Sequence, residues 1–262
     1  MRLTRELRVT LGAADAAGPN TWAGRPTGHP FTPFLTLRVT VEGHVDPATG
    51  YVCAISQLDR LLRDRAVPLL QNGHARQGHG DADPAGILSA MAQATAAHVP
   101  PGTKLVELEW RLSPYLRFTL VQGAPPMVQL TEQFEFSASH RLYCPALSAA
   151  ENDRIFGKCA NPNGHGHNYV LDVTVEGNVA AHTGWVVEPQ PFERTVIERV
   201  IEPFDHKHLN QDCAEFAELN PTVENLARVI WMRLHDHVAP GRLVCVRLWE
   251  TPKTCAECRG DS

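Results

Sequence analysis

The chain has 262 residues, of which 43% are hydrophobic and 20% are charged, a composition typical of a folded globular protein. This composition excludes a disordered, collagen-like or coiled-coil protein. The formal net charge is -5 and no five like charges are consecutive, which argues against nucleic acid or an anionic membrane as a partner. No run of about 18 apolar residues is present, so we expect no membrane-spanning helix.

The first residues of the sequence and its cysteines suggest the cellular compartment of the protein. Arg5, Glu6 and Arg8 interrupt the stretch where a secretory signal would be apolar. Seven cysteines are an odd number, and a chain of this length does not depend on disulfides, so they fit a reducing compartment. We therefore expect a cytoplasmic protein whose cysteines are buried residues, ligands or nucleophiles.

The sequence contains an internal repeat. Residues 39–43, Val-Thr-Val-Glu-Gly, return as residues 173–177, and 9 of the 14 positions from Val39 to Val52 are identical in the second copy. Chance does not produce this identity, so the chain is predicted to contain two similar units. The segment Gly123-Ala-Pro-Pro126 between them is typical of a linker.

The same order of elements is predicted in both copies. In the first copy a strand at 39–43 is followed by helices over 56–70 and 87–98 and by strands over 105–112 and 116–122. In the second copy a strand at 173–177 is followed by helices over 190–201 and 223–237 and by strands over 243–249 and 254–259. Helices that are separate from antiparallel strands indicate an α+β fold. We predict two domains, residues 1–125 and 126–262, each with a four-stranded antiparallel sheet and two helices on one face.

Three histidines of the second copy have the spacing of a metal site. His140 ends an alternating strand, and His165 and His167 begin the next one. Because residues two apart on a strand share a face, a hairpin would bring all three rings together. Three histidines with an open fourth position are the arrangement of a catalytic zinc site. Surface histidines beside glycine turns are the alternative, but a strand-end histidine with a nearby His-x-His and a cysteine favours the metal.

Cys159 is a candidate nucleophile or base. It lies between Lys158 and a polar Asn-Pro-Asn loop, with five residues separating it from His165. A lysine and a nearby dication would both lower the pKa of the thiol, which predicts a reactive thiolate. The alternative is a small buried hydrophobic residue.

Asp205 and His206 form a candidate acid and base pair, because a carboxylate can fix the tautomer of a neighbouring imidazole. Taken alone, this pair is more typical of a solvated polar turn.

Six ordered motifs in residues 129–260 resemble the 6-pyruvoyltetrahydropterin synthase family. They are Phe136–His140, Phe156–Cys159, Asn161–Tyr169, Asp205–Leu209, Pro221–Asn225 and Trp249–Thr251. The resemblance implies the T-fold, whose units join their sheets edge to edge into a β-barrel and stack head to head. It therefore implies two tandem T-fold units, the first degenerate, in a homo-oligomer whose closed barrel leaves no free sheet edge.

The resemblance also implies a role for each matching residue. The zinc ligands would be His140, His165 and His167, the general base Cys159, and the proton relay Asp205 with His206. Glu250 would anchor the pterin, since a carboxylate accepts two parallel hydrogen bonds from the 2-amino group and the adjacent ring N–H. Thr222 and Glu224 look like the segment that completes a pterin pocket at a subunit interface. Read without the family, Glu250 would be a strand-end acid, and Thr222 with Asn225 a helix cap.

The implied activity is a carbon–oxygen lyase that converts 7,8-dihydroneopterin triphosphate into 6-pyruvoyltetrahydropterin with loss of triphosphate. A second branch of the family forms 6-carboxytetrahydropterin for queuosine and deazapurine synthesis. The five residues between Cys159 and His165 match pyruvoyl-forming members, whereas carboxy-forming members typically have three. The second product and a non-catalytic pterin-binding scaffold stay open as alternatives.

The first copy has lost these residues. At the repeat offset, His165 and His167 correspond to Phe31 and Pro33, and at a slightly longer offset Glu250 corresponds to Leu112. Asp205 and His206 correspond to Gln71 and Asn72. We therefore expect one zinc ion per chain, bound by the second copy.

Two other segments carry potential metal ligands without indicating a metal site. The glycine-rich stretch 72–81, which contains His74 and His79, is predicted to be a mobile loop. Cys255 and Cys258 are three residues apart on a predicted strand and should point to opposite faces, which argues against a Cys-x-x-Cys site.

Overall fold

The computed structural model describes residues 1–11, 33–77, 83–123, 126–180 and 183–260. Two compact units make up the chain, residues 1–130 with 176–186, and residues 131–175 with 187–262. None of the helices described within these ranges combines the length and apolarity needed to cross a bilayer.

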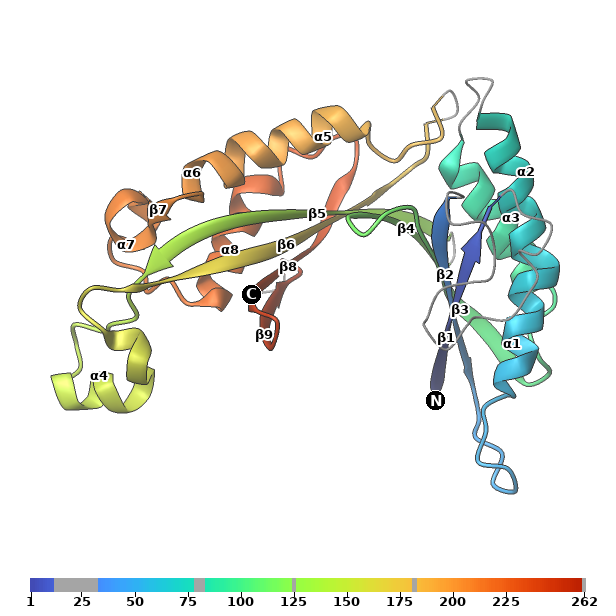
Figure 1. Cartoon of the computed structure of the whole chain (residues 1–262), viewed down its shortest axis with the longest axis horizontal. Coiled ribbons are helices and arrows are strands. Elements are labelled where there is room, and N and C mark those ends of the chain that lie inside the picture. The colour runs from blue at the N-terminus through green and yellow to red at the C-terminus, as the bar shows by residue number, and fades with distance from the viewer. Residues whose placement is uncertain (12–32, 78–82, 124–125, 181–182, 261–262) are drawn as a thin grey trace. The chain divides into compact units, whose positions relative to one another are not determined.

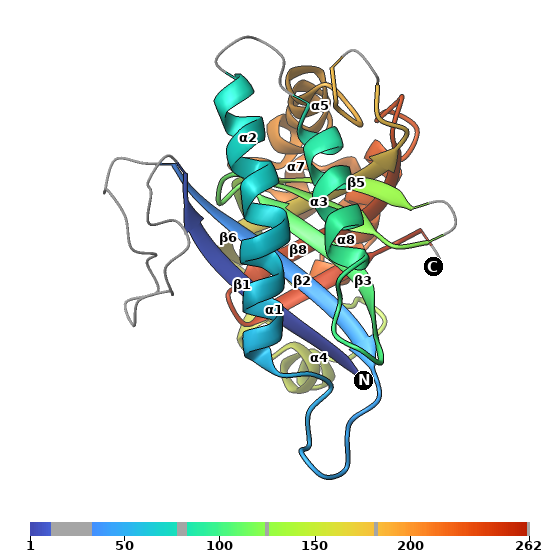
Figure 2. The same ribbon diagram turned by 90° about the vertical axis from the view of Figure 1, so that its right-hand side faces the viewer.

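The first unit packs its helices on one face of an antiparallel sheet (Figure 1). Its strands follow one another in chain order: β1 (Arg2–Thr10), β2 (Phe34–Gly43), β3 (Thr103–Arg111) and β4 (Leu116–Val121). Helix α1 (Ile55–Leu61) continues through a π-turn (Leu62–Ala66) into α2 (Val67–Gln77), and α3 (Pro84–Ala96) lies beside it (Figure 2). The alternation of β2 explains this layering, because Leu37, Val39 and Val41 are fully buried while Arg38 and Glu42 point to the other face.

The second unit repeats this plan with additions. Its strands are most of β5 (Met127–His140) and of β6 (His165–Gly177), and all of β8 (Arg242–Thr251) and β9 (Thr254–Cys258), with the short β7 (Lys207–His208) parallel to β5. Its longer helices are α4 (Ala149–Phe156), α5 (Pro189–Val196) and α8 (Val223–Leu234). Shorter turns are a 3-10 turn (Gly157–Ala160), a π-turn (Ile197–Ile201), α6 (Glu202–Phe204), α7 (Leu209–Asp212) and a second 3-10 turn (Ala214–Phe216). Figure 1 shows α5 and α6 running along β5 and β6.

The register of β5 against β6 divides the side chains between two faces. Thr131 bonds Thr174 through their hydroxyl groups at 2.9 Å, and Ser137 donates to the Asn168 amide oxygen at 2.7 Å, so these residues share a polar face. On the opposite face Phe136 stacks on Tyr169 with a ring separation of 5.0 Å. The apolar core of the unit therefore lies on the face of even-numbered β5 residues.

Structural detail supports the internal repeat. Thr40, the counterpart of Thr174, makes the same hydroxyl bond at 2.9 Å to Thr4 on the neighbouring strand. The first long helix of each unit contains a π-turn at nearly the same place in the repeat. The predicted α+β class is confirmed, whereas assembly into a barrel stays a proposal.

Some predictions about the elements were wrong or incomplete. Residues 72–77, predicted to be part of a mobile loop, are helical because the first helix continues to Gln77, while residues 78–82 with His79 lie outside the described residues. Helix α4 and strand β7 were not predicted. Phe31 also lies outside the described residues. Cys255 is exposed and Cys258 is buried, so the prediction of opposite faces is confirmed.

One buried carboxyl group on β5 has no partner within the described part of the chain. Oε2 of Glu132 is buried without a hydrogen bond, on the face that carries Phe136. Burial, with a further contribution from Glu193 of α5, raises the pKa of Glu132 to about 7. The folded chain therefore binds the Glu132 proton more tightly than the unfolded chain does. The protonated carboxyl group stabilises the folded state at low pH, and this contribution is lost as the pH rises towards 7.

We predict that Glu132→Gln reduces the loss of stability between pH 5 and pH 8. At pH 8 the variant should melt about 3 °C or more above the parent chain, because it buries no ionised carboxylate. Thermal unfolding followed by circular dichroism across this pH range measures the effect. Glu135→Gln, at an exposed position of the same strand, is the matched control. Identical pH profiles for Glu132→Gln and the parent chain would contradict the prediction.

Candidate metal and catalytic site

The three predicted metal ligands meet at the end of the β5–β6 hairpin. The register that pairs Ser137 with Asn168 places His140 opposite His165, and their Nε2 atoms are 3.2 Å apart. The ring centres of His140, His165 and His167 are separated by 4.6, 4.7 and 5.1 Å. One nitrogen from each ring lies within 4.8 Å of the others, so the three side chains could hold one ion.

His140 is fixed in one orientation and one tautomer. It is fully buried, and its Nδ1 lies 2.7 Å from the carbonyl oxygen of Pro221. A carbonyl only accepts, so Nδ1 carries the hydrogen and the lone pair of Nε2 faces the other two histidines. Burial lowers the pKa of His140 to about 4, with smaller contributions from the neighbouring histidines, and this keeps the imidazole neutral as a metal ligand must be.

The residues present fit a zinc ion. Nε2 of His167 is buried without a hydrogen-bond partner in the described part of the chain, as is Nδ1 of His165. Leaving a buried polar nitrogen unpaired costs about 1 to 3 kcal/mol, and coordination of an ion would satisfy such an atom. Three histidine nitrogens are the protein donor set of a catalytic zinc site.

Glu250 of β8 lies against this cluster. Its Oε1 is 3.5 Å from Nε2 of His140 and 3.6 Å from Nε2 of His167. The family resemblance implies that Glu250 binds the pterin, and its position beside the histidines was not predicted. A group held by this carboxylate would therefore be located directly next to the metal ligands.

Cys159 lies in the 3-10 turn Gly157–Ala160, and its carbonyl accepts a hydrogen bond from the Leu142 N–H at 2.9 Å. Burial, followed by the charge of Glu250, raises the pKa of the Cys159 thiol. Lys158 is exposed and is not among the groups that shift this pKa, so the predicted lowering depends on a dication at the histidines and stays a prediction. A dication on the histidines would act in the opposite direction to Glu250.

Sequence reasoning did not identify Tyr169 as part of this site. The residue is fully buried, and its hydroxyl has no hydrogen-bond partner in the described ranges. Burial raises the pKa of Tyr169, and Glu250 and Cys159 raise it further, so the three groups share one environment. The available signal was the alternation of β6, which puts Tyr169 on the same face as His165 and His167.

Asp205 and His206 form the predicted pair. Oδ2 of Asp205 is 2.8 Å from Nδ1 of His206, and Oδ1 accepts the Ser137 N–H at 2.8 Å. The Ser137 bond, with His206 second, lowers the pKa of Asp205. His206 has a positive φ of 56°, and its side chain is 81% exposed. The carboxylate therefore orients an imidazole that is open to solvent.

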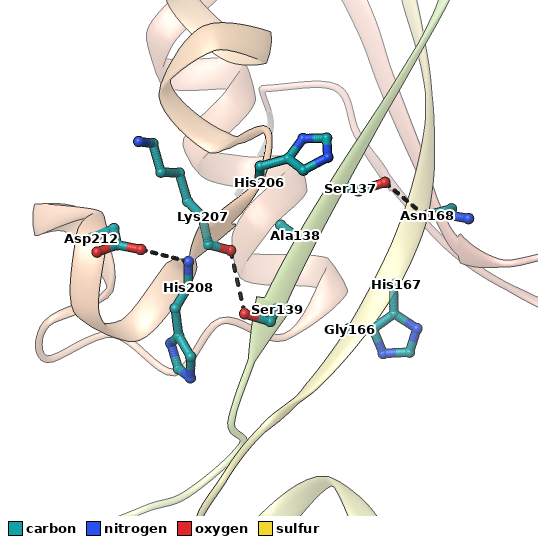
Figure 3. A pocket seen from close by; sticks show the side chains of 10 residues that line it. All are labelled: Ser137, Ala138, Ser139, Gly166, His167, Asn168, His206, Lys207, His208 and Asp212. Carbon is teal, nitrogen blue, oxygen red and sulfur yellow. Dashed lines mark hydrogen bonds between the residues drawn. The ribbon is translucent and has the colours of Figure 1, made fainter.

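His206 faces an open groove of about 560 Å³ at the ends of β5 and β6 (Figure 3). The wall opposite includes Asn168 and His167, and the near side includes His208 and Asp212. Within the described residues no hydrogen bond or ion pair joins Asp205 or His206 to Cys159. Of this pair, His206 lines the groove, together with His167 of the histidine cluster.

His208 was included in a motif without any role. Its Nδ1 is buried and unpartnered in the part of the chain that the structure describes, and its backbone N–H donates to Asp212 at 2.7 Å. A Cβ added to Gly164, which has a φ of +69°, would lie 3.0 Å from Nε2 of His208 and 2.8 Å from the His140 carbonyl oxygen. Glycine is therefore required where the chain passes these histidines.

Thr222 and Glu224 lie at the beginning of α8. Oγ1 of Thr222 accepts the Asn225 N–H at 3.3 Å, so the helix-cap interpretation is confirmed. Glu224 is exposed in the first turn. Their predicted place in a pocket at a subunit interface stays a prediction.

The second half of the chain is similar to known proteins. A family model described as 6-pyruvoyl tetrahydropterin synthase matches residues 129–261, slightly more than half of the chain. The 6-pyruvoyl tetrahydrobiopterin synthases of Pongo abelii and Homo sapiens are 42% and 41% identical over 139 residues, which cover 53% of this chain and 96% of each relative. The solved 6-pyruvoyl tetrahydropterin synthase of Caenorhabditis elegans is 36% identical, covers 52% of this chain and 97% of its own, and has a TM-score of 0.49. The chain therefore belongs to the 6-pyruvoyl tetrahydropterin synthase family.

Proposed function

We propose that this chain is a zinc-dependent lyase that converts 7,8-dihydroneopterin triphosphate into 6-pyruvoyltetrahydropterin with loss of triphosphate. The observation that carries the proposal is the cluster of His140, His165 and His167, with a neutral His140 and an unpartnered His167 nitrogen. Membership of the family and relatives named as 6-pyruvoyl tetrahydrobiopterin synthases support the substrate class.

The histidines would hold the zinc, which when bound supplies a Lewis acid that acidifies C–H bonds next to the hydroxyl groups of the substrate side chain. Glu250 would accept two hydrogen bonds from the amino and N–H edge of the pterin. Because Glu250 lies 3.5 Å from His140, a pterin held there would have the histidines beside it.

Cys159 would act as the general base that removes a proton from the side chain. Glu250 contributes to the pKa shifts of both Cys159 and Tyr169, which supports a position of the thiol near the proposed pterin. His206, oriented by Asp205, would exchange protons on the solvent side. Thr222 and Glu224 would complete a pocket of a neighbouring subunit.

We further propose that residues 126–262 form the catalytic T-fold domain and residues 1–125 a degenerate T-fold domain without a metal site. Among the described residues, the one group of side chains that could hold a metal lies in the second copy. A cytoplasmic location, as expected from the sequence, belongs to the same proposal.

The direct test is incubation of zinc-loaded protein with 7,8-dihydroneopterin triphosphate, followed by mass analysis of the pterin formed. The expected product is 6-pyruvoyltetrahydropterin with free triphosphate. Formation of 6-carboxytetrahydropterin would instead assign the chain to the second branch of the family. Tight binding of the pterin without turnover would support a scaffold.

We predict one tightly bound zinc ion per chain. The His165→Ala/His167→Ala double variant should lose it, because His140 alone cannot hold the ion, whereas His237→Ala, at an exposed position, should retain it. Metal analysis of purified protein by mass spectrometry measures this. Two zinc ions per chain, or zinc retained by the double variant, would overturn the prediction.

Cys159→Ala should retain zinc and fold but lose turnover by a factor on the order of a hundred or more, the scale for removal of a positioned base. Cys255→Ala, which changes an exposed cysteine of β9, should match the parent chain. Unchanged turnover in Cys159→Ala would remove this thiol from the mechanism and leave His206 as the candidate base.

The tandem arrangement suggests a homo-oligomer. The two models below assume that three single units close the ring in this family. In one model each chain places one copy in each of two stacked rings, so three chains complete both rings. In the other model first and second copies alternate around one ring that holds an even number of units. We favour three chains, because second copies then share one ring and Thr222 of one chain can reach the next. Mass measurement in solution should show three chains. Two or four chains would favour alternation, and a fully active monomer of 28.9 kDa would exclude both.

A further inference from the structure

The orientation of the His140 ring depends on the Pro221 carbonyl, which lies outside the helices and strands. Pro221 precedes the N-cap Thr222 of α8, so its carbonyl lies outside the helical hydrogen bonds. This oxygen nevertheless accepts the 2.7 Å hydrogen bond that sets the tautomer of a fully buried metal-ligand candidate. Whatever positions Pro221 therefore positions Nε2 of His140.

Hydrogen bonds among three residues on either side of Pro221 hold its backbone in place. We call this group, Asn220, Thr222 and Asn225, the clasp. The Asn220 carbonyl accepts the Thr222 N–H at 2.8 Å across Pro221, and it also accepts Nδ2–H of Asn225 at 2.9 Å. The pyrrolidine ring fixes φ of Pro221, so these two bonds leave its carbonyl little freedom of direction.

The clasp is also tied to the strand that carries His140. The Tyr143 N–H donates to Oδ1 of Asn220 at 3.2 Å, three residues beyond His140. The His140–Pro221 bond thus lies between an attachment to the β5 end and an attachment to the first turn of α8. The side-chain amide of Asn225 links α8 to the Asn220 carbonyl, and the backbone N–H of Asn225 separately donates to Oγ1 of Thr222.

We propose that Asn225 is a positioning residue of the metal site, which holds the Asn220–Thr222 turn so that the Pro221 carbonyl keeps Nε2 of His140 directed at His165 and His167. This inference rests on the proposed zinc site and adds a residue outside the ligand set. The hydrogen bonds of Asn225 in the described part of the chain go to Thr222 and Asn220 and not to a histidine of the cluster, so its contribution passes through Asn220 and Pro221.

The test compares zinc affinity at 20 °C in the full chain, measured by competition with a chromogenic chelator. Asn225→Ala removes the Nδ2 bond but keeps the backbone N–H that Thr222 accepts, and Asn225→Asp keeps the shape while replacing the donor by an acceptor. Both should weaken zinc binding about 10- to 100-fold, the usual effect of losing a group that orients a ligand. Arg228→Ala, one turn later at an exposed position of α8, should stay within about twofold of the parent chain.

A second readout separates positioning from a purely structural role. Cobalt(II) bound in place of zinc should show an altered visible absorption spectrum in the Asn225 variants, because the direction of one ligand changes. If Asn225→Ala and Asn225→Asp lower the melting temperature of the metal-free chain but leave zinc affinity and the cobalt spectrum unchanged, the inference is overturned while the zinc site stands. If the parent chain binds no zinc, the zinc site and this inference both fail.

Discussion

The site depends on the register between β5 and β6. Because side chains alternate on a strand, a slip of one residue would move His140 to the polar face and separate it from His165. Contacts between the two strands stabilise the observed register, among them the Thr131–Thr174 hydrogen bond and the stacking of Phe136 on Tyr169. The geometry at the strand ends is thus determined by pairs further along the hairpin that take no part in the chemistry. The alternation of side chains along β5 and β6 produces both the polar face and the opposite face that carries the three histidines.

Spacing was sufficient to predict the features that depend on local geometry. His-x-His on a strand and a strand-end histidine predicted the cluster, and helix and strand periodicity predicted the α+β class. The position of Glu250 and the role of the Pro221 carbonyl could not be predicted in this way, because β8 and the start of α8 are distant in sequence from the histidines. The direction of the Cys159 pKa shift in the metal-free chain could not be predicted for a related reason. A neighbouring lysine is visible in sequence, whereas burial and the charge of Glu250 arise only on folding.

The two copies show which parts of the unit tolerate change. Both retain the Thr–Thr bond on the polar face and the alternating apolar face that packs under the helices. The proposed metal-binding and acid–base residues of the second copy have no counterparts in the first copy's sequence. These side chains lie at strand ends and in connecting turns, where their replacement leaves the packed sheet and helices intact. The first copy therefore keeps the sheet and helices without these side chains.

The π-turns have a consequence for the history of the chain. Such a turn holds one residue more than the regular helix around it, so it records an insertion that the packing of the helix against its sheet has accommodated. Its presence in both Leu62–Ala66 and Ile197–Ile201 is most simply explained by an insertion in a single ancestral unit. On this explanation the helical irregularity was already present in the unit before it was duplicated.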